Sequence, residues 1–240
     1  MPMPELQQLT ISQARLLALL GQGFLGERPK TVLDVLKHTN LLQIDTVNVF
    51  ERAHYLPIFS RMGPFPKVAL DDLTRGSSPS LVEYWAHEAA ILPMADLPLF
   101  SWRRKQFRDE IAKKSENHWV NQNRDLMDWV LDEIREKGAM TASEIEHDRN
   151  KAVGTWWGWS DVKIAIEWLF RLGEVNCASR KNFSRVFDLP ERILPSEILK
   201  SEIDEVVAKK ILLLRAARSY GVATARDLFD YFRMPFSANR

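Results

Sequence analysis

Cysteine and long apolar runs are scarce in this sequence. Cys177 is the only cysteine in 240 residues, which excludes a disulfide framework and a zinc or redox site built on a CxxC pair. The chain has no run of about 18 apolar residues, the length that a membrane span needs. Residues 1–8 also lack the basic and apolar regions of a secretory signal. We therefore expect a cytoplasmic protein that has no membrane partner.

The sequence also lacks the common motifs that bind metals, nucleotides and organic cofactors. Its 5 histidines show no HExxH spacing. GxxxxGKS/T is absent, and the one GxGxxG, at residues 21–26 (GQGFLG), ends a predicted helix and lacks the preceding strand of a dinucleotide site. Without GxSxG there is no nucleophile elbow from which a serine triad could be inferred. These absences predict a protein that uses neither a metal nor an organic cofactor.

A surplus of one charge sign is missing as well. The chain has 33 basic and 32 acidic side chains, a formal net charge of +1, which excludes a polycation but leaves room for a local basic face. With 45% apolar and 27% charged residues, the composition is that of a globular protein. A chain of this length can bury a core without metal or disulfide staples.

Helical periodicity dominates what the sequence does contain. Apolar residues recur at helical spacing in residues 12–24, 32–36, 125–137, 160–172 and 202–220. Two segments differ from this pattern. Residues 41–49 form a short apolar run that indicates a buried strand, or a tight turn before a short helix. Residues 81–92 are bounded by turn residues and can form a strand pair.

Residues 119–195 follow the order of a winged helix. The predicted elements are a helix at 125–137, a capping box at 141–144, a helix at 160–172, strands at 174–178 and 185–189, and a polar turn at 179–182. Gly138 ends the first helix and Gly173 ends the last one. In this motif the third helix is presented to a DNA groove.

An internal repeat extends this arrangement. Residues 138–145 align in register with residues 221–228, because glycine, threonine, alanine, an acidic residue and an aliphatic residue recur at the same places. A long helical segment precedes both copies. Repeats of a supersecondary unit indicate a tandem architecture. The sequence therefore predicts a mainly α fold with small β wings, built from tandem winged helix-turn-helix domains.

The predicted domains are residues 1–118, a first winged helix with a connecting helix; residues 119–195, a second winged helix; and residues 196–240, the incomplete start of a third. Too few residues follow Met234 for the third helix and wing of that domain, which indicates part of a longer polypeptide. We therefore expect the apolar side chains of Phe232 and Phe236 to be poorly covered.

Gln43-Ile44-Asp45 is the first candidate for chemistry. In an extended segment, Gln43 and Asp45 share one face while Ile44 packs inward. An amide beside a carboxylate can hold and activate a water molecule. The alternative is structural, with Asp45 capping a helix that starts near Thr46 and Gln43 bonded to backbone. On spacing alone the capping interpretation is favoured, because aspartate is a preferred N-cap.

Aromatic side chains form two further clusters. Tyr84, Trp85 and His87 lie in the predicted strand pair and can line a cleft that binds DNA, although a Trp–His pair more often packs in a core. Trp156 belongs to a dense group of indoles before the third helix of the predicted winged helix. Indoles stack on bases or wedge into a duplex, but they also seal cores because of their large apolar area.

Basic side chains lie where a winged helix would contact phosphates. Arg180, Lys181 and Arg185 lie on the predicted wing, and Lys163 lies near the start of the third helix. Basic residues also cluster in residues 103–114, where a solvated helix face explains them equally well.

Taken together, these segments resemble a known family, the AlkZ-like winged-helix DNA glycosylases, and within it the YcaQ branch. The resemblance spans essentially the whole chain and rests on residues 41–46 (LLQIDT), 55–56 (YL), 59–61 (FSR), Gly63, 83–89 (EYWAHEA), 156–157 (WW), Arg180, 182–183 (NF) and 185–186 (RV). Gln43-Ile44-Asp45 matches the Gln-aliphatic-Asp signature of the branch. The resemblance therefore implies that Asp45 and Gln43 are catalytic, and it adds Arg61 to the candidate DNA-binding residues.

The resemblance implies a fold of three tandem winged helices followed by a β-rich domain, and an enzyme that removes alkylated guanines. An N7-alkylated guanine is cationic and already a good leaving group. A carboxylate that stabilises the sugar cation and directs a water at C1′ would complete the hydrolysis. The sequence departs from the family in length, because the rest of the third winged helix and the β-rich domain are missing from it.

The predicted function is that of a DNA repair enzyme, a monofunctional DNA glycosylase that excises N7-alkylated guanine and unhooks interstrand crosslinks. Its expected partner is double-stranded DNA carrying alkylated or crosslinked guanine. We expect a monomer when full length, in the cytoplasm and associated with the nucleoid when bound to DNA. The alternatives are a winged-helix transcriptional regulator without catalysis, which would bind a specific sequence as a dimer, and a protein-interaction module, which would bind no DNA.

Overall fold

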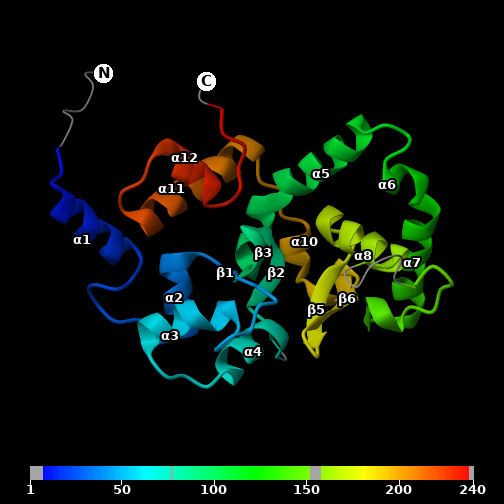
Figure 1. Ribbon diagram of the computed structural model, residues 1–240, viewed down its shortest axis with the longest axis horizontal. Coiled ribbons are helices and arrows are strands. Elements are labelled where there is room, and N and C mark those ends of the chain that lie inside the picture. The colour runs from blue at the N-terminus through cyan, green and yellow to red at the C-terminus, as the bar shows by residue number, and fades with distance from the viewer. Residues whose placement is uncertain (1–7, 77, 152–157, 238–240) are drawn as a thin grey trace. The chain divides into compact units, whose positions relative to one another are not determined.

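The structure, a computed structural model, describes residues 8–76, 78–151 and 158–237 (Figure 1). The chain groups into two compact units. The first comprises Met1–Leu70, Ala86–Ala90 and Lys209–Arg240, and the second comprises Asp71–Trp85 and Ile91–Ala208. This grouping does not test the domain boundaries predicted after residues 118 and 195, which stay a prediction.

Short helices build the first unit. Its elements are α1 (Ile11–Gly21), α2 (Val32–Thr39), β1 (Leu42–Gln43), η1 (Ala53–Tyr55), α3 (Leu56–Met62), most of α11 (Glu205–Tyr220) and α12 (Ala225–Asp230). α1 begins one residue earlier than predicted, because Thr10 and Gln13 form its capping box. It also ends at Gly21 rather than near residue 24.

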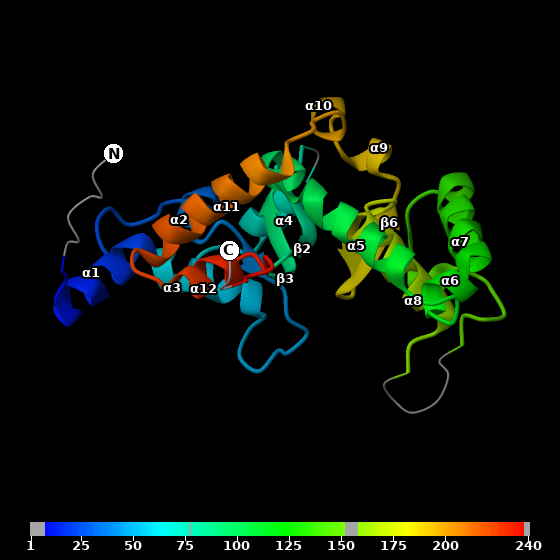
Figure 2. The same cartoon turned by 90° about the horizontal axis from the view of Figure 1, so that it is seen from above.

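α1 and α11 approach each other closely near their C-terminal ends (Figure 2). Gln22, the residue after α1, donates a hydrogen bond from Nε2 to the Ser219 carbonyl at 2.7 Å. A Cβ at Gly21 would lie 2.6 Å from a backbone oxygen of α11, and a Cβ at Gly221 would meet the backbone of Leu17. This backbone-to-backbone packing therefore requires glycine at both positions.

The core of the first unit combines α2, α3 and α11 with the segment after α12. Its buried apolar side chains include those of Val35, Leu36, Leu42, Ile58, Leu212, Ala216 and Phe232. Tyr231 Oη donates to the Thr39 carbonyl at 2.6 Å, which fastens the segment after α12 to α2. The expectation for Phe232 is therefore wrong, because its side chain is 2% exposed, whereas Phe236 is 44% exposed as expected.

A hairpin follows α4 (Val68–Arg75). β2 (Leu81–Ala86) and β3 (Glu88–Pro93) confirm the strand pair predicted at residues 81–92. With β1 they form a three-stranded sheet in the order β1-β3-β2. Within the first unit, the Ile44 N–H donates to the Ala89 carbonyl at 2.8 Å and joins the segment after β1 to the start of β3.

The second unit contains the predicted series of helices and strands. Its elements are η2 (Met94–Phe100), α5 (Ser101–Lys113), α6 (Trp119–Gln122), α7 (Arg124–Lys137), β4 (Met140–Thr141), η3 (Ala142–Glu144), α8 (Asp161–Leu172), β5 (Asn176–Lys181), β6 (Ser184–Asp188), α9 (Pro190–Ile193) and α10 (Ser196–Leu199). The capping box at Thr141 is present, but it opens a single 3-10 turn. β4, β6 and β5 form a second sheet in that order.

α7 and α8 pack against each other and against the second sheet. Val130 and Ile134 from α7, Ile166 and Phe170 from α8, and Phe187 from β6 are each at most 1% exposed. α8 ends as predicted at a left-handed Gly173 and begins one residue later than predicted, because Ser160 is its N-cap. The helical pattern of the sequence therefore located this part of the core correctly.

The turn of the β5–β6 hairpin lies later than predicted. Ser179 to Lys181, assigned to the turn because they are polar, continue β5 and pair with β6. The turn residues are Asn182 and Phe183, whose φ angles are 49° and 69°. Two successive left-handed residues match the twist of a tight hairpin. Within this polar stretch, the side chains of Arg180 and Lys181 form ion pairs with Glu83 and Glu144 beside the sheet.

The sequence repeat has a structural counterpart. α7 and α11 are each followed by a glycine with positive φ, 89° at Gly138 and 68° at Gly221. A threonine capping box comes next in both copies, at Thr141 and at Thr224. The mainly α fold with small β elements is confirmed, while tandem repetition of winged helices stays a prediction. Within the ranges that the structure covers, we find no helix both long and apolar enough to cross a bilayer.

Candidate active site

Gln43, Ile44 and Asp45 lie in an extended segment of the first unit with alternating burial. Leu42 and Ile44 are 0% and 9% exposed, whereas Gln43 is exposed and Asp45 is half-buried. The hydrogen bond from Ile44 to β3 fixes the segment in place. The alternation therefore turns the Gln43 amide and the Asp45 carboxylate away from the core, as a period of two requires.

The Asp45 carboxylate braces a turn and does not cap a helix. Its Oδ1 accepts a hydrogen bond from the Val47 N–H at 2.9 Å, as in an Asx turn. The capping interpretation is wrong, because the next helical turn after Thr46 is η1. Within the described ranges, Asp45 Oδ2 and the Gln43 amide have no hydrogen-bond partner. Both groups are therefore available to a water molecule or a substrate.

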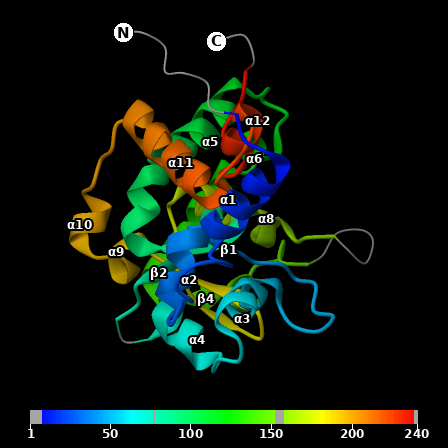
Figure 3. The same cartoon turned by 90° about the vertical axis from the view of Figure 1, so that its left-hand side faces the viewer.

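The loop between β1 and η1, residues 46–52, projects from the first unit in the view from above and in the side view (Figures 2 and 3). The exposed fractions are 60% for Val47, 77% for Val49 and 96% for Phe50. The sequence predicted a buried strand or a tight turn over residues 41–49. Only Leu42–Gln43 is a strand, and the apolar residues after Asp45 are in solvent.

An apolar pocket of about 430 Å³ opens beside this loop in the first unit. It is lined by Phe50, Glu51, Tyr55, Leu56, Phe59, Pro64, Phe65 and Lys67. η1, which carries Tyr55, packs against β1. Lys67 forms an ion pair with Glu51 and lies 5.3 Å from the centroid of the Tyr55 ring. The pocket therefore adjoins the segment that carries Gln43 and offers aromatic faces to an apolar or cationic group.

Arg61 and His87 are held by other parts of the first unit. Arg61 is 7% exposed, donates from Nε to the Gln22 carbonyl at 2.5 Å and stacks over the Phe24 ring. Burial lowers the pKa of Arg61. The His87 ring is hydrogen-bonded through Nδ1 to the Tyr231 carbonyl at 3.1 Å. The placement of Arg61 argues against the predicted DNA contact and assigns it to stabilising the unit.

Tyr84 and Trp85 lie on β2 in the second unit. Tyr84 is 1% exposed and donates from Oη to the Arg171 carbonyl at 2.8 Å, so its burial argues against the predicted DNA contact. Trp85 is half-buried, with the Arg171 and Arg185 guanidinium groups 5.0 and 6.0 Å from its ring. Trp156, also predicted to bind DNA, lies outside the described residues.

Arg180 and Arg185 are enclosed in a buried ion-pair network of the second unit. Arg180 contacts both carboxylate oxygens of Glu83, at 2.5 and 2.8 Å. Arg185 contacts Glu83 and Glu167, each at 3.1 Å. The four side chains are 6% to 13% exposed. Burial alone would raise the pKa of Glu83, but the two arginines outweigh it and lower that pKa.

This network argues against the phosphate contacts predicted for Arg180 and Arg185. Both guanidinium groups are already neutralised by carboxylates, and a phosphate could recruit them only by taking a cationic partner away from the buried Glu83 or Glu167. Residue position along the hairpin was sufficient to place the arginines on the wing. It could not reveal a carboxylate from β2 facing them.

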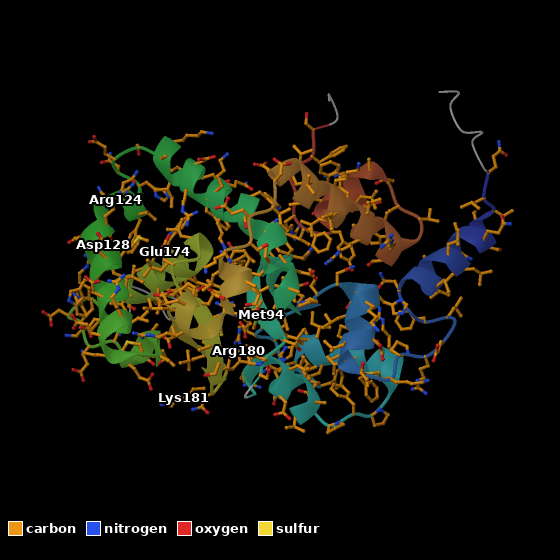
Figure 4. All side chains as sticks on the ribbon, turned by 180° about the vertical axis from the view of Figure 1, so that it is seen from behind. Met94, Arg124, Asp128, Glu174, Arg180 and Lys181 are labelled. Carbon is orange, nitrogen blue, oxygen red and sulfur yellow. The ribbon has the colours of Figure 1, made fainter. Side chains whose placement is uncertain are left out.

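Lys163 and Lys181 keep their ammonium groups closer to solvent. Lys181, at the end of β5, is 67% exposed and pairs with Glu144 at 2.7 Å (Figure 4). This hydrogen bond is the largest cause that lowers the pKa of Glu144 to about 2. Lys163 is 31% exposed and pairs with Glu167 at 2.6 Å. These two lysines are the predicted wing and helix cations that a phosphate can reach.

The basic segment at residues 103–114 falls mainly on α5. Arg103 is 6% exposed and donates to the Trp85 carbonyl at 2.9 Å. Arg108 is half-exposed and pairs with Glu174 at 3.1 Å. The segment is therefore partly an anchor within the second unit and only partly the solvated face that we considered.

The exposed loop tip is a feature that the sequence analysis missed. Val47 and Val49 stand in the same two-residue phase as Gln43 and Asp45, the face that points away from the core. A strand continued through them would therefore have pointed both valines to solvent. Valines at solvent-facing positions are inconsistent with a half-buried strand, and from this inconsistency an exposed loop could have been predicted.

Comparisons with known proteins add two findings. The family model described as DNA glycosylase AlkZ-like matches residues 36–239. The solved structure of DNA glycosylase AlkZ from Streptomyces sahachiroi is similar, with a TM-score of 0.63 and 13% sequence identity. The match covers 95% of this chain and 65% of that one. At this identity the likeness shows a shared fold, and the present chain spans 65% of the length of the AlkZ chain.

Proposed function

The chain belongs to the AlkZ-like DNA glycosylase family, and from this premise we propose that it is a monofunctional DNA repair glycosylase acting on N7-alkylated guanine, including guanine held in an interstrand crosslink. The observation that carries the proposal is the presentation of Gln43 and Asp45. Both polar groups stand on the solvent side of a segment anchored by buried Leu42 and Ile44, and both keep unpaired atoms among the described residues.

The chemistry needs little more than these two groups. Alkylation at N7 makes the guanine a cation, so the base leaves with the electron pair of the C1′–N9 bond and becomes neutral. Asp45 stabilises the positive charge that develops on the sugar. It also accepts a proton from the water that attacks C1′, while the Gln43 amide orients that water. The new C1′–OH bond leaves an abasic site and an intact strand.

The exposed position of the pair suits a bulky substrate. Enzymes that act on a base normally take it out of the stack and enclose it in a pocket. A guanine bonded to the opposite strand cannot be enclosed in this way. Gln43 is exposed rather than at the bottom of a cavity, so it can reach the glycosidic bond of a base that stays tethered.

The test is incubation of the chain with duplex DNA that carries one N7-methylguanine. We expect an abasic site at the lesion, with strand cleavage only after alkali, because water rather than an amine is the nucleophile. A transcriptional regulator would bind one sequence as a dimer and release no base. A protein-interaction module would bind no duplex. Either result would overturn the proposal.

Lys163 and Lys181 are expected to neutralise phosphates when the duplex binds. Each phosphate contact adds about 0.9 to the slope of log Kd against log salt concentration. Replacing both lysines by alanine should therefore reduce the slope by up to about 2 and weaken binding equally for all sequences. The slope is measured by fluorescence anisotropy of labelled duplexes over a salt series.

The matched control is Lys30→Ala with Lys137→Ala. These lysines are 77% and 54% exposed and each pairs with a glutamate, as Lys181 does. We expect the control to keep the wild-type slope. A wild-type slope in Lys163→Ala/Lys181→Ala would assign DNA binding to another face.

A further inference from the structure

The tip of the loop at residues 46–52 places a large apolar side chain in solvent. Phe50 is 96% exposed, and its neighbour Val49 is 77% exposed. A phenylalanine gains free energy from burial, and contiguous exposed apolar residues commonly mark a surface that contacts a partner. The tip therefore needs a partner that buries it.

The loop is braced, so the tip is held in place rather than free to fold back. Its first residues are fixed by the hydrogen bond from the Val47 N–H to Asp45. Its two sides are joined by the bond from Arg52 Nη1 to the Thr46 carbonyl at 3.0 Å and by the antiparallel bridge between Asn48 and Arg52. A pre-ordered apolar tip loses little entropy when it inserts into a partner.

The base of the loop is the candidate active site. Asp45 is both the proposed catalytic carboxylate and the first brace of the loop, so the tip and the carboxylate share one local framework. Glu51, next to the tip, is paired with Lys67, which leaves Phe50 and Val49 as the uncharged end of the loop. A duplex that presents C1′ to Asp45 therefore lies within reach of the tip.

We propose that Phe50, supported by Val49, is a wedge that enters the stack of duplex DNA beside the modified guanine. The proposal rests on the proposed glycosylase function, because duplex DNA is the partner that this function supplies. Phenylalanine is among the side chains that separate base steps and kink a duplex. A crosslinked or alkylated guanine must be partly unstacked before water can reach C1′. Phe50 is thus a positioning residue and takes no part in bond making.

The direct readout is base stacking. The probe is a duplex with 2-aminopurine next to a 2′-fluoro N7-methylguanine, whose glycosidic bond resists hydrolysis. Saturating wild-type chain should raise the 2-aminopurine fluorescence, because an unstacked aminopurine is no longer quenched. Phe50→Ala should abolish the rise, and Phe50→Leu, which keeps an apolar side chain, should retain part of it. The matched control is Phe236→Ala, since Phe236 is exposed in the same unit.

The second readout is base release from two substrates. Unstacking a base step costs a few kcal/mol, so Phe50→Ala should slow release of N7-methylguanine from a duplex about 10- to 100-fold. Release from single-stranded DNA, which needs no wedge, should stay within about twofold of wild type. A loss of folding would lower both rates together, and the melting temperature of each variant checks this.

Four results would overturn the wedge. In the fluorescence assay, these are a rise that persists in Phe50→Ala and the absence of a rise in a wild-type chain that binds the duplex. In the release assay, the result is an equal loss of release from single and double strands in a folded Phe50→Ala variant. The fourth is a wild-type dimer that Phe50→Ala converts into monomers. The last result would assign the tip to self-association. A wild-type chain that binds duplex but releases no base would overturn the glycosylase proposal, whereas the fluorescence result would still decide the wedge.

Discussion

Replacing Asp45 by asparagine is expected to slow release of N7-alkylguanine about 10²- to 10⁴-fold. The substitution keeps the size of the side chain but removes the negative charge that stabilises the sugar cation and the base that takes the proton from water. By the rate arithmetic this is about 2.7 to 5.4 kcal/mol of transition-state stabilisation. The measurement is single-turnover release of the base from a duplex of defined sequence.

The fold should survive this change. An asparagine carbonyl accepts the Val47 N–H as the Asp45 carboxylate does, so the free energy of unfolding should change by less than about 1 kcal/mol. Asp204→Asn is the matched control, because Asp204 Oδ1 accepts the Val206 N–H at the same distance of 2.9 Å. Gln43→Ala should cost less activity than Asp45→Asn, since it only orients the water. Wild-type activity in Asp45→Asn would return the motif to a structural role.

Replacing Arg185 by alanine is expected to destabilise the second unit by about 2 to 4 kcal/mol. The change would remove one of two cationic partners from each carboxylate, leaving Glu167 with Lys163 and Glu83 with Arg180, in a site where the two are 6% and 10% exposed. Removing one member of a buried ion pair is costly because the remaining charge stays desolvated. The free energy of unfolding is measured by urea titration, with tryptophan fluorescence as the probe.

Lys181→Ala is the control for this measurement, because the Lys181–Glu144 pair is exposed and such pairs contribute at most about 1 kcal/mol. A loss of less than 1 kcal/mol in Arg185→Ala, combined with a reduced salt slope for DNA binding, would contradict the structural role of Arg185. That combination would restore the phosphate contact predicted from the sequence.

The same network makes the folding stability of the second unit depend on pH under acidic conditions. The pKa of Glu83 is lowered in the folded chain. Its ionised carboxylate therefore contributes fully to the free energy of unfolding above pH 4.5, the ordinary pKa, and this contribution is lost as the pH falls toward the lowered pKa. The melting temperature should therefore fall on acidification below about pH 4.5. In Glu83→Gln this part of the pH dependence should disappear, because glutamine does not titrate. If the melting temperature of Glu83→Gln falls with pH as that of the wild type does, other carboxylates cause the acid destabilisation.

Local patterns in the sequence were enough to locate much of the fold. The periodic segment at 160–172, with Gly173 after it, is α8 apart from Ser160, which is the N-cap. The repeat at Gly138 and Gly221 recurs as two left-handed glycines followed by capping boxes. These features depend on backbone geometry and on residues a few positions apart, which a sequence displays directly.

Contacts between distant residues were beyond the sequence. Arg180 and Arg185 were placed correctly on a hairpin, but Glu83, which neutralises them, comes from a strand far away in the chain. Phe232 was expected at a bare end, yet it packs into a core made with α2 and α11. The alternating burial at residues 42–45 was predictable, because it depends only on the two-residue period of an extended backbone. The exposure of Phe50 was not, because it depends on where β1 ends.

The most direct test of the central claim is mass spectrometric detection of free N7-methylguanine, with the chain in excess over a duplex that carries one N7-methylguanine. The account predicts that the wild-type chain releases the base far faster than spontaneous depurination, and that Asp45→Asn binds the same duplex with similar affinity but releases it at least about 100-fold more slowly. A wild-type chain that binds the duplex and releases base no faster than buffer would contradict the account.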